Sequence, residues 1–366
     1  MNRIEIICPA EHPGLVSPRL RDILSRALKP GGEYRWLFRT EELTQISASR
    51  LLFVISLDET GTNLEYTRML AKIRRSPHLF DGMVGGVIVD GVHEIYTKST
   101  ARDLVFAANQ AGCIFPGKPL VEATGSLQNF RIQARNQGVD WMEAYRLAVK
   151  ELAVRICSYQ APKYDHPELL VLHASHFHTS NTWTFWEMVK KNLTGVGVKE
   201  ISLRNGQIFD CTGCPYKMCM HFSEKGSCYY GGAMVEEVYP AVQNCSGLLL
   251  LCPNYNDSVS ANIAAFINRL TALFRIKPFY EKYMFGIVVS GYSGGDIVAS
   301  QLISSLNMNK AFLLPPRFAV LETANEPGSI REIPEIEKQA EAFATHIVQV
   351  FAGIGAEPRL LSSAGT

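Results

Sequence analysis

The stretch Gly86-Val87-Ile88-Val89-Asp90-Gly91 has a counterpart at an offset of 200, Gly286-Ile287-Val288-Val289-Ser290-Gly291. Each is a short apolar run that ends in a glycine and precedes a helical pattern. Two further pairs have the same offset: Pro116 with Pro316 and Glu122 with Glu322. Because near-continuous runs of Val, Ile and Leu are typical of strands covered on both faces, the repeat predicts one parallel α/β unit written twice. Chance similarity between two α/β domains is the alternative.

Further apolar runs support the same architecture. The predicted buried strands are Ile4–Cys8, Leu51–Ser56, Met83–Val89, Leu169–Leu172, Leu248–Cys252, Gly286–Ser290 and Phe312–Leu314. Helical patterns separate them, and Asp140–Ile156 and Pro334–Phe351 close the two halves. We expect an α/β protein of two tandem doubly wound domains, each a mostly five-stranded parallel sheet with helices on both faces. The expected domains are residues 1–160 and 165–356, with a linker near Ser158–His166.

Composition excludes several classes of protein. The chain has 366 residues, of which 47% are hydrophobic and 19% charged, so a large core in two or three domains is expected. Thirty-six Lys and Arg balance 35 Asp and Glu, which argues against nucleic acid as a partner. Apolar runs such as Gly247–Cys252 are too short for a membrane span, and Met1–Glu5 carries charge where a signal peptide is apolar. A cytoplasmic location without membrane contact is therefore expected.

The offset between the two halves changes along the chain. The first strands start at Ile4 and Leu169, an offset of 165, whereas the third start at Leu51 and Leu248, an offset of 197. The second half therefore carries an insertion between these strands, predicted over 204–232. Four cysteines lie in it: Cys211, Cys214, Cys219 and Cys228. The other five, Cys8, Cys113, Cys157, Cys245 and Cys252, are expected to be buried small hydrophobes.

A polar loop follows the first strand of the second half. His173 ends that strand, and Asn181 and Thr182 open a helix. A strand, a loop of small polar residues and a helix N-terminus together form an anion site, which favours a phosphomonoester. The candidate residues are Ser175, His176, His178, Ser180, Asn181 and Thr182. Ordinary helix capping by Ser180 or Asn181 is the alternative, and the histidines lack the spacing of helical zinc pairs.

Two further loops follow predicted strands of the same half. Their candidate residues are Pro253, Asn254, Tyr255, Asn256 and Ser258 in one, and Ser290, Gly291, Tyr292, Gly294 and Gly295 in the other. In an open doubly wound sheet, ligands bind at the carboxyl ends of the strands. Tyrosines and glycines there suit a flat aromatic ligand, although turn-rich connections would have the same composition.

These three loops resemble, in order and spacing, the flavodoxin-like NAD(P)H-dependent FMN reductase superfamily, over about Leu169–Gly353. The segment Cys211–Cys228 is similar to its iron–sulfur flavoprotein branch. The resemblance implies two flavodoxin-like domains, FMN phosphate on the first loop and the flavin ring between the other two. In the first loop Ala174, His176, Phe177 and Ser180 stand where the family usually has Gly, Pro, Arg and Gly. The cysteine spacing is also more open than in the family.

The four cysteines leave three interpretations open. Four thiolates can bind a [4Fe–4S] cluster, or they can hold a structural zinc ion. They can also bind no metal, since related flavin reductases carry partial cysteine sets. A cluster beside a flavin can pass single electrons to it, which zinc cannot do.

The first half keeps the scaffold and lacks the polar loops. Cys8–Gly14 contains two prolines, which have no amide donor, and Glu11, which repels phosphate. Leu57–Asn63 adds Asp58 and Glu59. We therefore expect a degenerate flavodoxin-like domain without an FMN site. It could replace a partner subunit as a pseudo-dimer within the chain, or act as a separate module; further homodimerisation stays open.

The sequence thus predicts an FMN-dependent oxidoreductase, with electrons coming from NAD(P)H or a ferredoxin-type donor and going to an unknown acceptor. A [4Fe–4S] cluster is expected beside the flavin. Its partners would be small redox molecules or a ferredoxin-like protein. An electron-transfer or redox-sensing module without its own substrate is one alternative, and a zinc-stabilised, flavin-free binding protein is another.

Overall fold

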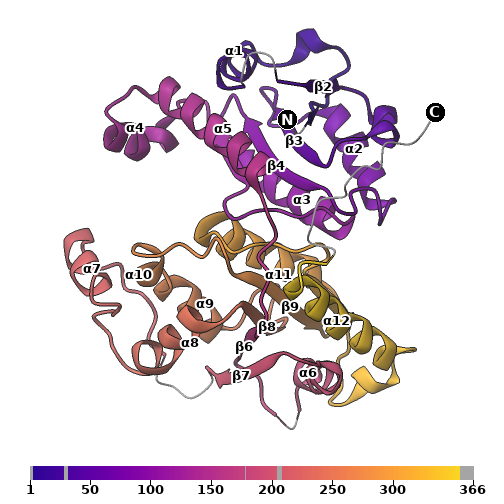
Figure 1. Cartoon of the computed structure of the whole chain (residues 1–366), viewed down its shortest axis with the longest axis vertical. Coiled ribbons are helices and arrows are strands. Elements are labelled where there is room, and N and C mark those ends of the chain that lie inside the picture. Colours follow the sequence, from indigo (N-terminus) through magenta and orange to yellow (C-terminus); the bar gives the residue numbers. More distant parts are fainter. Residues whose placement is uncertain (1–2, 29–31, 178, 204–207, 355–366) are drawn as a thin grey trace. The chain divides into compact units, whose positions relative to one another are not determined.

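The computed structural model describes residues 3–28, 32–177, 179–203 and 208–354. The chain forms two compact units, Met1–Gln160 and Ala161–Ala356 (Figure 1). None of the helices that the structure describes combines the length and the apolar character needed to span a membrane.

Unit 1 is built on a five-stranded parallel sheet. In the order β2-β1-β3-β4-β5, its strands are Tyr34–Leu37, Ile4–Ile7, Arg50–Ser56, Val84–Asp90 and Leu120–Ala123. The helices are α1 (Pro18–Ala27), α2 (Leu64–Arg74), α3 (Thr97–Gln110), α4 (Arg131–Gln137) and α5 (Trp141–Ser158). Helix α1 packs on α5, and α2 packs on α3. The chain leaves β1 for β2 on one side and returns on the other side at β3, which makes the unit doubly wound.

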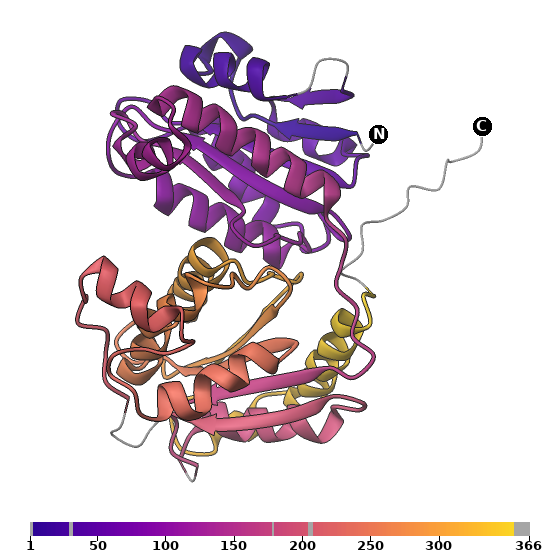
Figure 2. The ribbon, with the colours of Figure 1, turned by 60° about the vertical axis from the view of Figure 1, so that its left-hand side comes forward.

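Unit 2 has the same topology. In the order β10-β9-β8-β6-β7, its strands are Ala319–Thr323, Tyr283–Ser290, Gly247–Pro253, Glu168–His173 and Gly197–Ser202, all parallel. The helices are α6 (Asn181–Asn192), α7 (Tyr216–Ser223), α8 (Tyr239–Asn244), α9 (Ala261–Arg269), α10 (Thr271–Phe274), α11 (Gly295–Leu302) and α12 (Ile336–Phe351). Helix α12, yellow in Figure 2, packs along α6. The predicted fold class, two tandem doubly wound α/β domains of the flavodoxin-like type, is confirmed.

The strands at the sheet edges are absent from the predicted set. They are β2 and β5 in unit 1, and β7 and β10 in unit 2. An edge strand is partly exposed, so it lacks the continuous apolar run of a central strand. The prediction of a strand at Phe312–Leu314 is wrong: that segment makes one isolated bridge, between Tyr283 and Leu313, and the strand next to β9 is Ala319–Thr323.

The offset of 200 does not mark structurally equivalent positions. Val89 lies opposite Glu122, and Val289 opposite Glu322, so the ladders have the same pairing. However, the Glu122 carboxylate accepts a hydrogen bond from Thr97 of α3, whereas Glu322 bonds Gln339 of α12. By chain order α12 corresponds to α5, on the opposite face from α3. Side chains alternate between the two faces of a strand, so a shift of one residue moves each of them to the other face. Structurally equivalent residues of β5 and β10 are therefore separated by an odd number of positions and not by 200. Duplication itself stays a prediction.

The insert lies where the change in offset predicts it. Residues 38–49 connect β2 to β3, whereas the much longer segment 203–246 connects β7 to β8, and the excess equals the change in offset. This connection carries the four clustered cysteines, helix α7 and helix α8. Among the connections between successive strands, the two units therefore differ most in length at this crossover.

A buried ion pair fastens the carboxyl edge of the unit 1 sheet. Arg19, in the first turn of α1, donates from Nε and Nη2 to the two carboxylate oxygens of Asp90, at 3.0 and 3.2 Å. The same guanidinium donates to the carbonyls of Gly91 and Gly125, and Tyr145 donates its hydroxyl to Asp90 at 3.3 Å. The Asp90 side chain is only 4% exposed. This arginine is therefore fully committed to the protein itself.

We predict that Asp90→Asn destabilises unit 1 by about 2 to 3 kcal/mol, because it leaves the partly buried Arg19 guanidinium without its counter-charge. Hydrogen–deuterium exchange of β4 and β5 amides measures this loss for unit 1 alone. The matched control is Asp22→Asn, which removes an exposed pair with Arg26 and should cost less than about 0.5 kcal/mol. Equal exchange rates in the two variants would contradict the role given to Asp90.

Candidate functional site

The candidate site lies at the carboxyl edge of the unit 2 sheet, between β6 and β8. These two strands are neighbours although β7 separates them in the chain, so the winding direction reverses between them. Loops that leave such a switch point in different directions border the usual ligand position of a doubly wound sheet. The predicted residues that the structure describes all lie in the loops or strand and helix ends at this edge. His178 lies outside the described residues.

The first loop places one hydroxyl in a buried position with no partner. Ser175 is fully buried, and its Oγ has no hydrogen-bond partner among the residues that the structure describes. Ser180 is the N-cap of α6 and accepts a hydrogen bond from the Trp183 amide at 3.2 Å, as the capping alternative predicts. His176 is exposed, whereas Thr182 is buried at 1% exposure. Ser175 therefore has buried hydrogen-bonding capacity that the described residues do not use.

Aromatic packing holds the first loop. The His173 ring lies 5.2 Å from the Phe177 ring and 4.7 Å from the Trp183 ring, centroid to centroid. Phe177 and Trp183 also meet edge to face, at 4.6 Å. Burial lowers the pKa of His173, so its imidazole is neutral near pH 7. Phe177, at the position where the family usually has Arg, thus brings apolar packing in place of positive charge.

The Asn181 side chain makes its hydrogen bonds within the protein. Its Nδ2 donates to the carbonyls of Ala324 and Glu326 at 3.1 and 2.8 Å, and its Oδ1 accepts from the Gly328 amide at 2.9 Å. Both ends of the side-chain amide are therefore used within the protein, and a role of Asn181 in holding a phosphate stays a prediction that would fall to its backbone amide. The side chain fixes the loop after β10, which has no distinctive motif and is absent from the predicted site.

The second loop is a tight reversal. Tyr255 and Ser258 exchange backbone hydrogen bonds at 3.2 and 3.1 Å, and Asn256 and Asp257 between them have φ of 52° and 57°. Asn and Asp tolerate this left-handed conformation better than other non-glycine residues. Tyr255 is 53% exposed at the tip.

The second and third loops are locked together by Asn254. Its Nδ2 donates to the Ser293 carbonyl at 2.7 Å and to the Ser290 hydroxyl at 3.2 Å. Gly294 completes the lock, since it has φ of 82° and a Cβ there would lie 2.0 Å from Asp257 Oδ1. Tyr292, which is 81% exposed, accepts a hydrogen bond from Asn325 of the loop after β10.

Three buried polar atoms at this edge have no partner within the described residues: His173 Nδ1, Ser175 Oγ and Asn254 Oδ1. His173 ends β6, Ser175 follows it and Asn254 follows β8, so the three residues border one switch point. Buried polar atoms are nearly always hydrogen-bonded in native proteins. Their concentration here indicates that the site is completed by a ligand or by ordered water.

The four cysteines of the insert line one cavity of about 110 Å³. Arg269 and Arg275 also line it, and the Nε of each is buried with no partner in the described part of the chain. Arg269 donates to the carbonyls of Phe209 and Gly231 at 3.3 and 2.8 Å, which ties the cysteine segment to the end of α9. All four cysteines are free thiols. Within the described part of the chain, no three Cys, His, Asp or Glu groups are close enough to hold one metal ion.

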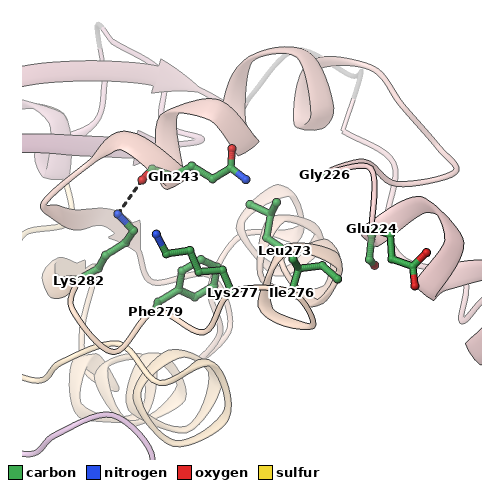
Figure 3. Close-up of a pocket in the computed structure, with 9 residues that line it drawn as sticks. Glu224, Gly226, Gln243, Leu273, Ile276, Lys277, Phe279 and Lys282 are labelled. Atoms are coloured by element: carbon green, nitrogen blue, oxygen red, sulfur yellow. Dashed lines mark hydrogen bonds between the residues drawn. The ribbon is translucent and has the colours of Figure 1, made fainter.

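A second cavity, of about 240 Å³, lies next to the insert (Figure 3). Glu224, after α7, and Leu273 and Ile276, at and after α10, are among its lining residues. Lys277 and Lys282 lie on its other side, and Lys282 donates to the carbonyl of Gln243 at 2.9 Å. The two cavities beside the cysteine segment are thus lined by two arginines and two lysines, respectively.

One comparison with known protein families finds a match within unit 2. Residues 167–326 match the family model of NADPH-dependent FMN reductases. The match begins just before β6 and ends in the loop that Asn181 holds. No curated protein sequence matches the chain.

Solved structures resemble the chain distantly. An NAD(P)H:quinone oxidoreductase from Methanothermobacter marburgensis has 14% identity and a TM-score of 0.38, covering 50% of this chain and 98% of that one. The Trp repressor binding protein from Bacillus subtilis has 18% identity and a TM-score of 0.33, covering 47% and 96%. An FMN-dependent NADH-azoreductase from Bacillus anthracis str. Ames Ancestor, in complex with FMN, has 12% identity and a TM-score of 0.30, covering 50% and 99%.

We predict that Gly294→Ala separates the second and third loops, because its Cβ would displace Asp257 and strain a positive φ. Hydrogen exchange should become faster over residues 253–260 and 290–295. The control is Gly195→Ala, which also has positive φ (70°) but meets no atom within 4 Å. That change should cost only the conformational strain, about 1 kcal/mol. Loop exchange that is no faster in Gly294→Ala than in Gly195→Ala would show that the lock is unimportant.

Proposed function

We propose that unit 2 is an FMN-dependent oxidoreductase that takes electrons from NAD(P)H. The observation that carries the proposal is the set of unpartnered buried polar atoms at the switch point, in a unit whose core matches the FMN reductase family model. A flavin mononucleotide suits loops that carry hydroxyls, amides and exposed tyrosines at such an edge.

The residues of the site divide the work of binding. Ser175, beside the N-terminus of α6, would donate its hydroxyl to the phosphate, together with free backbone amides of the loop. Asn254 Oδ1 would accept a hydrogen bond from the ring system, and Tyr255 and Tyr292 would cover its faces. FMN, when bound, supplies a ring that accepts a hydride and releases electrons singly or in pairs. Asn181 and Gly294 would act by holding loops in place.

We infer further that the four insert cysteines bind a [4Fe–4S] cluster. Four thiols border one cavity, and two arginines with unused donors border it as well, which suits a negatively charged four-thiolate group. Structural zinc in an all-thiolate site is the alternative occupant of the same four thiols. Iron and acid-labile sulfide distinguish the cluster from zinc.

We predict that the purified protein binds FMN and that Ser175→Ala weakens this binding about five- to ten-fold, as expected for loss of one hydrogen bond to an anion. Quenching of flavin fluorescence measures the affinity. The control is Thr194→Ala, in the α6–β7 connection at the opposite edge of the sheet. A wild-type protein without bound flavin, and without affinity for added FMN, would overturn the proposal.

We predict that the anaerobically purified protein contains about four irons per chain and acid-labile sulfide, with visible absorbance beyond that of the flavin. Cys214→Ser should lose the iron, whereas Cys157→Ser, in unit 1, should keep it. Iron-free protein, with or without zinc, would refute the cluster and leave the FMN proposal to be judged on its own test.

The electron donor gives a second candidate function. Lys277 and Lys282 beside the cysteine segment favour an acidic donor protein such as a ferredoxin, in which case the unit is an electron carrier. Bleaching of the flavin by NAD(P)H in the absence of any protein donor supports the oxidoreductase. Bleaching by reduced ferredoxin alone supports the carrier.

A further inference from the structure

Unit 1 contains a large cavity at its own switch point. The cavity has a volume of about 710 Å³ and is lined by the loops after β1 and β3, with Val92 from the loop after β4. Strands β1 and β3 are neighbours in the sheet although β2 separates them in the chain. The cavity therefore occupies the ligand-binding position of a doubly wound sheet, in the unit for which no FMN site is expected.

The lining of this cavity is acidic and contains neither Lys nor Arg among its described residues. Its four carboxylates belong to Glu11, Asp58, Glu59 and Glu65. Glu11 and Glu65 share one arginine, Arg68, at 3.4 and 3.0 Å. Glu65 has a buried side chain and also accepts hydrogen bonds from Thr40. Arg68 thus offsets the charge of Glu11 and Glu65. Asp58 and Glu59, both exposed, have no cation among the described residues that line the cavity.

Asp58 is held in its ionised form. Its Oδ1 accepts hydrogen bonds from the Thr60 amide and hydroxyl, at 2.8 and 2.6 Å, and from the Thr62 amide at 3.0 Å. These donors keep the pKa of the Asp58 carboxyl below its ordinary value. Its Oδ2 receives a hydrogen bond from the Thr62 hydroxyl at 3.2 Å and keeps unused acceptor capacity.

Apolar side chains also line this cavity although they are exposed. Leu15, Leu64 and Val92 are 57%, 68% and 52% exposed. An aliphatic group gains free energy when a ligand covers it, at roughly 25 cal/mol per Å². The combination of aliphatic surface with carboxylates suits a molecule that has an apolar body and a positive charge.

The same loops are unsuited to an anion. The Ser17 amide donates to Ser56 Oγ at 3.1 Å, Pro18 has no amide hydrogen, and the Leu20 amide is capped by Ser17 Oγ. Arg19, at the start of the helix, is committed to Asp90. A phosphate at this place would meet carboxylates and few free donors.

We propose that this cavity is a binding site for a small organic cation with an apolar ring or chain. A metal ion is a poor alternative, since the described residues include no group of three carboxylates or imidazoles that could hold one. The proposal does not depend on the function of unit 2.

The test uses a matched pair of fluorescent probes, 2-(1-naphthyl)ethylamine and 1-naphthaleneacetate, which share a ring and differ in charge. Titration of the full-length protein should show saturable binding of one amine per chain. The acid should bind at least about ten-fold more weakly, and added salt should lower the affinity for the amine. Equal affinities for the two probes, or no saturable amine binding at millimolar concentration, would overturn the proposal.

Variants locate the site. Glu59→Gln and Asp58→Asn should each weaken amine binding about three- to five-fold, because each removes one partly solvated charge. Because Glu59 is exposed, Glu59→Gln is not expected to disturb folding. This variant therefore still tests the site if Asp58→Asn alters the loop. The control is Glu41→Gln, whose side chain is 79% exposed and does not line the cavity. An equal effect of Glu41→Gln would show non-specific attraction and refute the site.

A second readout separates this site from the proposed flavin site. FMN affinity, measured in the same Glu59→Gln protein, should stay at the wild-type value. Loss of FMN binding together with amine binding would show that one pocket serves both, which contradicts the proposal. Failure of FMN to bind any variant would count against the unit 2 function alone.

Discussion

The parallel pairing of β6 with β8 is the interaction on which the candidate site depends. His173 lies opposite Leu251 in this ladder, so both strands reach the same edge and their loops start side by side. The chain can make this pairing only after a crossover through β7 and the insert. The switch point is therefore a consequence of topology, and the buried strands Leu169–Leu172 and Leu248–Cys252 fix where its loops begin.

Two asparagine amides hold the edge in shape, and neither adds charge. Asn181 ties the loop after β10 to the start of α6, and Asn254 ties the second loop to the third. An amide can donate and accept at once, so a single side chain joins backbone groups of both kinds. The two asparagines differ in what they leave available. Asn254 keeps a buried Oδ1 without a partner among the described residues, whereas both ends of the Asn181 amide are used.

The central strands and the three loops could be predicted from the sequence because burial on both faces and turn residues leave local patterns. The edge strands could not, since partial exposure removes the pattern. The role of Asn181 depends on the loop after β10, which is so distant in the chain that no local rule reveals the contact. The offset of 200 pairs strands that do correspond in the two units. However, Glu122 and Glu322 contact helices on opposite faces of their sheets. Sequence similarity alone therefore does not determine which face of the sheet a side chain occupies.

The two units separate what a fold determines from what its loops determine. Both sheets have a switch point between their first and third strands, because the strand order is the same. In unit 1, Arg19 of that edge is paired with Asp90, and the loops carry carboxylates. In unit 2 the loops carry hydroxyls and amides, and some of their buried polar atoms have no partner among the described residues. Anions and cations need opposite loop chemistry, so the two loop sets are the basis on which the two proposals assign ligands of opposite charge to one topology.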